Sequence, residues 1–237
     1  MPDIDFPTWD IGRVSLLEHL HTTALGRLAA GDAILDQALV DETGAFLTGY
    51  KLKVEAVGER LGQRRLEIEQ RDQAKNRLDM FVRDFLVVLK RRMRRNGESA
   101  SLWALYGVDL DGALPHPKTA NELLYWGEEI VAGDVKAVEA GFPAMVNPSA
   151  AEVQAALEQA RAEVADVPQA ELAYDEAQAA AAAGRDQADA LIRRANMMLD
   201  YKLYGLEAAS VRRVKRTFGF TYRYRPDEPH DPDDPAE

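Results

Sequence analysis

Cysteine is absent from this chain of 237 residues, which removes several kinds of chemistry at once. Disulfide bonds, thiolate zinc sites, iron–sulfur clusters and cysteine nucleophiles all need a thiol. Histidine is scarce as well, and the pair His19 and His21 would point to different faces of a helix. We therefore expect no bound metal ion and no cofactor.

Long apolar runs are also missing, because no stretch approaches the roughly 18 uninterrupted apolar residues of a membrane-spanning helix. The first residues carry neither the basic segment nor the apolar segment of a secretory signal. We expect a cytoplasmic protein without a membrane span, and export by a route that needs no cleaved signal stays open.

Catalytic motifs are lacking too. The sequence contains no phosphate-binding loop, no dinucleotide-binding glycine pattern and no nucleophile elbow. Paired carboxylates such as Glu128 and Glu129 are adjacent on a helix and face different directions, which does not suit joint acid–base catalysis. We expect a protein that is not an enzyme, and an enzyme whose residues follow no recognised motif is one alternative.

Helical signals dominate what is present. Three capping boxes pair a hydroxyl residue with a glutamate three positions later, and each opens a segment with helical apolar periodicity: Ser15 with Glu18, Thr119 with Glu122, and Ser149 with Glu152. The sequence therefore predicts an all-α fold, with long antiparallel helices in a bundle of four or more.

Two segments of the chain resemble each other. The tetrapeptide of residues 71–74 recurs at 185–188, and an apolar helical stripe follows each copy at the same offset of 114 residues. Each segment then passes an arginine-rich region and ends at an aromatic–glycine pair, Tyr106-Gly107 in one and Phe218-Gly219 in the other. One amphipathic helix cannot bury its own stripe, so the repeat predicts a bundle with two related halves. Chance recurrence of the tetrapeptide is the alternative.

Proline and glycine divide the chain into five parts. We expect an extended N-terminal arm, a first helical half, a cross-connection with short helices, a second helical half, and an aromatic segment followed by an acidic tail. Their respective ranges are 1–14, 15–107, 108–148, 149–217 and 218–237.

Smaller breaks in the pattern define individual helices. The cross-connection is expected to hold one helix over 119–131 and another over 134–140, with Gly141 just past the end of the second. A long helix from about residue 44 onward has a polar middle over 62–75, which is typical of a helix that connects two packing regions or contacts a partner there. Pro168 either ends or kinks the helix that begins near Ser149.

Past Arg216 the apolar period changes from helical to alternating. The alternating residues are all aromatic and would share one face of a strand: Phe218, Phe220, Tyr222 and Tyr224. A lone strand leaves amide groups unpaired, so we expect these rings to contact another subunit, and coverage by the chain's own bundle is the competing explanation. The tail after them is proline-spaced and acidic and is not expected to fold by itself.

Two clusters of basic residues are the other candidate sites. The first lies at the end of a long helix and contains Lys90, Arg91, Arg92, Arg94 and Arg95. The second precedes the aromatic segment and contains Arg212, Arg213, Lys215 and Arg216. Such clusters bind nucleic-acid phosphates in some proteins, whereas in others they complement helix dipoles or pair with the chain's own acids. The net charge of −11 favours the second interpretation.

A non-catalytic structural or assembly protein is the function that these features favour. Long helices, an aromatic strand and extended termini are common means by which subunits bind other copies or a protein partner. We therefore expect a homo-oligomer or a complex with another protein. A nucleic-acid-binding accessory protein that uses the arginine clusters is the alternative from a different class.

Overall fold

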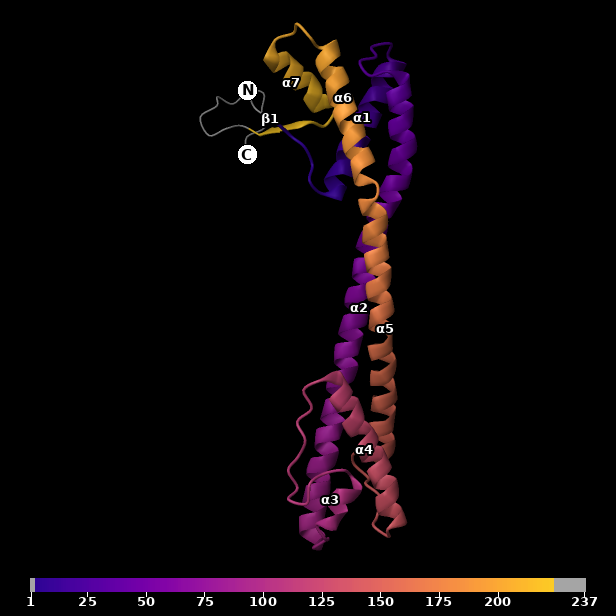
Figure 1. The fold of residues 1–237 in the computed structure, drawn as a ribbon, viewed down its shortest axis with the longest axis vertical. Helices are drawn as coiled ribbons and strands as arrows, with labels where there is room; N and C mark the ends of the chain where they lie inside the picture. Colours follow the sequence, from indigo (N-terminus) through magenta and orange to yellow (C-terminus); the bar gives the residue numbers. More distant parts are fainter. Residues whose placement is uncertain (1–2, 224–237) are drawn as a thin grey trace. The chain divides into compact units, whose positions relative to one another are not determined.

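The computed structural model describes residues 3–223, which are mostly helical, and the all-α expectation is confirmed (Figure 1). The chain divides into two compact units: the first combines Met1–Arg60 with Tyr174–Glu237, and the second is the central segment Leu61–Ala173. Two long helices, α2 (Gln37–Asn96) and α5 (Ala150–Ala182), contribute residues to both units. Each unit therefore takes residues from both of the expected helical halves.

The first unit packs α1 (Asp10–Ala29), α6 (Arg185–Lys202) and α7 (Ala208–Thr217) with the beginning of α2. Each of these helices contributes buried or partly buried apolar residues to one shared core. The largest fully buried side chains of this core are Leu17, Leu39, Tyr50, Phe218 and Phe220. The first unit is thus held together by residues from both ends of the chain.

A small sheet joins the two ends of the described chain. Strand β1 (Asp3–Asp5) pairs antiparallel with β2 (Thr221–Arg223), and Ile4 lies opposite Tyr222. The expectation of an unpaired aromatic strand was wrong for this part of the chain. The N-terminal residues, which we expected to form an extended arm, supply the missing hydrogen-bond partner.

Helix α1 begins five residues earlier than the sequence predicted. Its N-cap is Trp9, and Asp10 in the first turn places a carboxylate beside the positive end of the helix dipole. Ser15 lies inside the helix, so the predicted capping box with Glu18 does not form. The Glu18 carboxylate instead accepts a hydrogen bond of 2.7 Å from the Lys51 ammonium group on α2.

The second unit has its own core, formed by α2, α3 (Ser101–Leu105), α4 (Ala120–Glu139) and α5. Gly133 lets α4 approach α3 closely, because a Cβ atom at this position would lie 2.5 Å from Tyr106 Cδ1 and 2.8 Å from the Leu105 carbonyl oxygen. The sequence suggested a break between 131 and 134, whereas α4 runs through it as one helix. Glycine serves close packing here rather than a turn.

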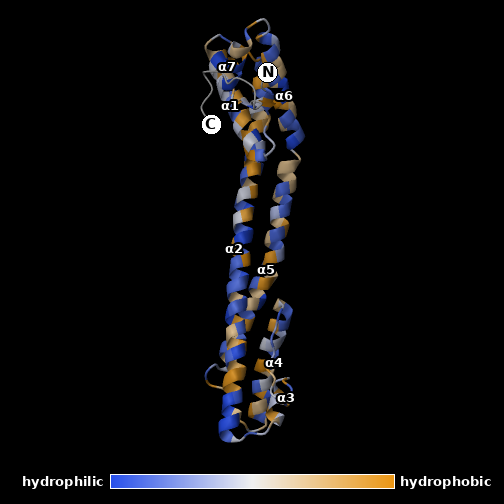
Figure 2. Ribbon diagram, turned by 90° about the vertical axis from the view of Figure 1, so that its left-hand side faces the viewer, coloured by the Kyte–Doolittle hydropathy of each residue, from blue (hydrophilic) through white to orange (hydrophobic). Residues whose placement is uncertain are grey.

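Within the second unit, α2 and α5 make their contacts in opposite order along the chain. Arg64 binds Glu171 at 3.1 Å, and further along α2 the Arg77 guanidinium donates to Gln159 Oε1 at 3.3 Å. The middle of α2 is mostly polar, as expected, and Figure 2 colours it mostly blue. An antiparallel bundle of four or more helices remains a prediction.

Two of the three predicted capping boxes are present. Thr119 and Glu122 cap α4 reciprocally, and Ser149 and Glu152 exchange the same pair of bonds at the start of α5. Gly141 follows α4 with a φ of 87°, as expected for the residue past a helix end. Helix α5 continues through Pro168, so this proline does not end it.

The two similar segments share several local features. The paired stripe positions Leu78 and Ile192, Phe85 and Leu199, and Leu89 and Leu203 are all buried. Both aromatic–glycine pairs have a buried ring followed by a glycine with positive φ, 68° at Gly107 and 91° at Gly219. Superposition of the two segments as a true repeat remains a prediction.

Candidate functional site

The most exposed group of large apolar side chains in the first unit lies at the end of α6. Met197, Tyr201, Tyr204 and Leu206 are 62%, 79%, 91% and 54% exposed, respectively. The first three recur at i, i+4 and i+7, which places them on one side of a helix and its continuation. We call these four residues the α6 face.

The fold positions this face by burying the opposite side of α6. Ile192, Leu199 and Leu203 pack in the core of the first unit, and Leu203 is the C-cap residue of the helix. Gly205, with a φ of 88°, then turns the chain towards α7. Tyr204 and Leu206 flank this turn and are directed away from the core, so the local geometry exposes both.

Charged residues lie at both ends of the α6 face. Arg193 is exposed one turn before Met197, and Glu207 is exposed directly after Leu206. Within residues 3–223 neither side chain makes a hydrogen bond or an ion pair. Arg194, by contrast, binds Glu42 at 2.7 Å. The face therefore has an available cation at its beginning and an available anion at its end.

The first basic cluster is split by the fold into two groups. The Lys90 ammonium group donates to the Gly112 carbonyl oxygen at 2.7 Å, and Arg92 donates to the Pro143 carbonyl oxygen at 2.6 Å and binds Glu98 at 3.4 Å. Arg91, Arg94 and Arg95 are exposed. Only these last three are available for a partner.

The second basic cluster is engaged inside the first unit. Lys215 is 3% exposed, and its ammonium group donates to Asp200 at 2.6 Å and to Asn196 at 2.7 Å. The Arg216 guanidinium lies over the Tyr222 ring at 5.5 Å, and Arg212 and Arg213 also interact with other groups. Lys215 and Arg216 therefore interact with groups of the chain itself, which is the alternative to nucleic-acid binding.

The aromatic segment is largely covered by the chain itself. Phe218 is fully buried, Phe220 is 2% exposed, and both belong to the core of the first unit. These two rings were expected to contact another subunit, but burial leaves them no free surface for one. Tyr222 lies on β2 and is partly exposed, and Tyr224 lies outside the described residues. The competing explanation therefore holds for Phe218 and Phe220.

A polar network ties the start of α1 to α2 and α6. The Asp10 carboxylate accepts two hydrogen bonds of 2.8 Å from Arg185 and one of 2.9 Å from the Tyr50 hydroxyl. The Arg185 bonds hold the pKa of Asp10 below its usual value. Arg13 binds Asp189 at 2.7 Å, and that hydrogen bond raises the pKa of the guanidinium. No sequence pattern predicted this network, because its members are far apart in the chain.

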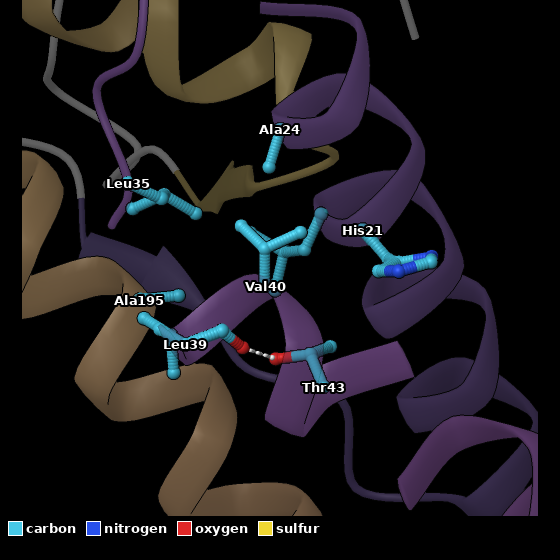
Figure 3. A pocket seen from close by; sticks show the side chains of 8 residues that line it. His21, Ala24, Leu35, Leu39, Val40, Thr43 and Ala195 are labelled. Carbon is cyan, nitrogen blue, oxygen red and sulfur yellow. Dashed lines mark hydrogen bonds between the residues drawn. The ribbon is translucent and has the colours of Figure 1, made fainter. Parts of the chain in front are cut away.

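A surface hollow of about 440 Å³ lies next to the network and is lined by Phe6, Pro7, Thr8, Arg13, Asp189, Ile192 and Arg193. Arg13 and Asp189 neutralise each other at its wall. A second hollow, drawn in Figure 3, is lined mainly by aliphatic side chains and has no room for a water molecule. Its Thr43 hydroxyl donates to the Leu39 carbonyl oxygen at 2.7 Å, and the His21 ring also lines it.

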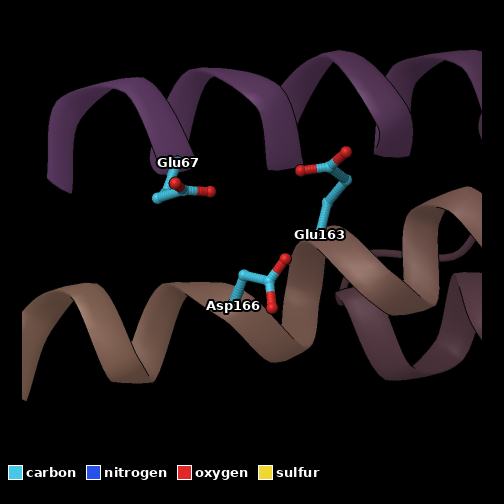
Figure 4. Close-up of side chains that lie close together, drawn as sticks. All are labelled: Glu67, Glu163 and Asp166. Atoms are coloured by element: carbon cyan, nitrogen blue, oxygen red, sulfur yellow. The ribbon is translucent and has the colours of Figure 1, made fainter. Parts of the chain in front are cut away.

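Three carboxylates meet in the second unit. Glu67 on α2 and Glu163 and Asp166 on α5 each bring one oxygen within 4.8 Å of the others (Figure 4). Oxygen ligands of this kind suit a divalent cation, although these side chains are partly or fully exposed to water. The i, i+3 spacing of Glu163 and Asp166 was visible in the sequence, whereas their approach to Glu67 depends on the pairing of α2 with α5.

Comparison with protein-family models, with curated proteins and with solved structures found no match to this chain. Among the described residues, no helix combines the length and the apolar character that a membrane span requires.

Proposed function

We propose that this protein is a non-catalytic structural protein that associates with a second copy of itself through the α6 face. The observation that supports this proposal is the exposure of Met197, Tyr201, Tyr204 and Leu206 within one short stretch. A contiguous apolar patch on a soluble protein marks an interaction site more often than isolated apolar residues do. Tyrosine and methionine are also enriched at protein interfaces.

The size of the face is compatible with a small specific interface. A buried aromatic side chain contributes about 150–250 Å², so Tyr201 and Tyr204 together offer on the order of 300 Å². Met197 and Leu206 each add the apolar area of an aliphatic side chain, which brings the total to roughly 500 Å² per copy. Two copies would then bury about 1,000 Å² in total, which is near the lower limit for a specific complex.

The spacing and the charges of the face favour a second copy as the partner. Apolar residues separated by four and three positions form the seam along which two helices pack. In an antiparallel pair of α6 helices, the Arg193 end of one copy lies towards the Glu207 end of the other. The available cation of each copy then approaches the available anion of its partner.

Sedimentation velocity of two matched variants tests this proposal. Tyr204→Glu places a charge in the proposed seam, and Leu52→Glu places the same charge at another exposed apolar position of the first unit, which is 63% exposed. We expect the wild-type chain and Leu52→Glu to associate equally with rising concentration and Tyr204→Glu to associate more weakly. Helicity should be the same in all three proteins, because both side chains are exposed.

Two outcomes would contradict the proposal. The first is a wild-type protein that is monomeric over the whole concentration range. The second is association of Tyr204→Glu with the same affinity as the wild type. Deletion of residues 218–237 is not a suitable test, because Phe218 and Phe220 belong to the core of the first unit.

A further inference from the structure

The outward side of α2 near its end carries three arginines that the fold does not use. Arg91, Arg94 and Arg95 are exposed, while Leu89 and Met93 on the opposite side are buried in the core of the second unit. We call the three arginines the arginine face. Like charges at i, i+3 and i, i+4 repel each other on a helix, so this arrangement is slightly unfavourable in the isolated chain.

The neighbouring cations hold the arginine face in place without neutralising it. Lys90 and Arg92 are bonded to the carbonyl oxygens of Gly112 and Pro143, which anchors the last turns of α2 to the loops beside it. Within residues 3–223 the side chains of the arginine face make no hydrogen bond or ion pair. An anionic partner would remove their mutual repulsion.

The sequence itself contains a segment with the complementary charge. Residues 226–237 read Pro-Asp-Glu, Pro-His-Asp, Pro-Asp-Asp and Pro-Ala-Glu, which is a triplet of proline, any residue and an acid repeated four times. The segment contains six acids and no lysine or arginine. The repeat places an acid at every third position of the segment.

We propose that the arginine face binds the acidic segment 226–237 of a second copy. Arg91 and Arg95 are one helical turn apart, about 6 Å along the axis, so their long side chains can bind two acids of the repeat at the same time. The arginine face lies in the second unit and uses other residues than the α6 face.

An acidic polypeptide fits this face better than nucleic acid does. Residues 224–237 carry a net charge of −5, from six acids and Arg225, so the remainder of the chain carries −6 out of the total of −11. That surplus repels a long polyanion. The aromatic rings of Trp103 and Tyr106, which follow α2, are buried in the core and present no surface on which bases could stack.

Fluorescence anisotropy with a labelled peptide of residues 226–237 tests the proposal. The full-length protein is titrated into the peptide, alongside the triple variant Arg91→Ala, Arg94→Ala, Arg95→Ala. The control is the triple variant Lys53→Ala, Arg60→Ala, Arg65→Ala, which removes three exposed cations elsewhere on α2. We expect the control to bind like the wild type, the first variant to bind at least tenfold more weakly, and binding to weaken as salt rises.

Several results would overturn the assignment. Absence of peptide binding to the wild-type protein at low salt is one, and equal loss of binding in both triple variants is another. Tighter binding of a single-stranded oligonucleotide than of the peptide at the same salt concentration would assign the face to nucleic acid. A peptide of the same composition in scrambled order tests the repeat, and equal affinity for it would overturn the role of the regular acid spacing.

Because the peptide is titrated as an isolated probe, its failure to bind would leave the association through the α6 face untouched. Conversely, peptide binding by a wild-type protein whose Tyr204→Glu variant associates with unchanged affinity would support the arginine face while contradicting the proposed function.

Discussion

Tyr50 and Asp10 are joined by a hydrogen bond of 2.9 Å from the phenol hydroxyl to a carboxylate oxygen, across 40 residues of sequence. The Tyr50 ring packs against Gly184, where a Cβ atom would lie 2.6 Å from Tyr50 Cδ2. Burial of the ring, and next the hydrogen bond to Asp10, raise the pKa of Tyr50 to about 12. One side chain therefore connects α2 with the starts of both α1 and α6.

Stability at alkaline pH should depend on Tyr50. Its pKa in the folded protein is above the unfolded value of about 10. The corresponding stability is therefore fully present below pH of about 10 and is lost as pH rises from there towards about 12. Tyr50→Phe should reduce the free energy of unfolding by about 0.5–1.5 kcal/mol at neutral pH and should flatten the alkaline decline. Urea denaturation at a series of pH values measures both effects, and an unchanged alkaline decline in the variant would contradict this assignment.

The core of the second unit should depend strongly on Phe85, which is fully buried. Phe85→Ala removes a whole aromatic ring and leaves a cavity, so we expect a loss of about 3–5 kcal/mol in the free energy of unfolding. Met80→Ala on the same helix is the control, because Met80 is 52% exposed and should change stability by no more than about 0.5 kcal/mol. Urea denaturation followed by circular dichroism compares the two, and similar losses in both would argue against a packed core around Phe85.

Two glycine-to-alanine substitutions should have opposite effects. Gly184→Ala introduces a methyl group against the Tyr50 ring and should destabilise the protein by about 1–3 kcal/mol. Gly58→Ala lies within α2, where an added Cβ meets nothing within 4 Å, and should stabilise the helix by about 0.5–1 kcal/mol. Thermal unfolding of both variants checks the signs. A stabilising effect of Gly184→Ala would show that α6 and α2 are less closely packed than described.

Thr119, which caps α4, and Ser15, which caps no helix, should respond differently to substitution by alanine. Thr119 accepts a hydrogen bond from the Glu122 amide at 3.2 Å, so Thr119→Ala should cost about 1 kcal/mol and should increase hydrogen exchange in the first turn of α4. Ser15 lies inside α1 and makes no such cap, so Ser15→Ala should leave stability unchanged or slightly increased. Equal destabilisation by the two substitutions would contradict the observed start of α1.

Local signals in the sequence were sufficient for the starts of two helices. The hydroxyl–glutamate pairs at Thr119 and Ser149 predicted the starts of α4 and α5, because a capping box is formed by residues only three positions apart. The polar middle of α2 and the buried stripe that contains Leu78 and Phe85 were also predictable from periodicity alone. Interactions over one or two helical turns involve residues that are close in the sequence, so the sequence alone can predict them.

Only the tertiary structure decided what the candidate sites present to a partner. The alternation of Phe218 and Phe220 predicted one apolar face, but whether a second subunit or the chain's own core covers that face depends on where β1 and α1 lie. Likewise, the basic clusters look alike as sequence, yet Lys215 is buried against Asp200 while Arg91 remains exposed. The exposure of Tyr204 follows from the burial of Leu203 beside it at the end of α6. Burial and pairing depend on residues that folding brings together from distant parts of the chain. The sequence alone therefore does not determine which side chains are buried or paired.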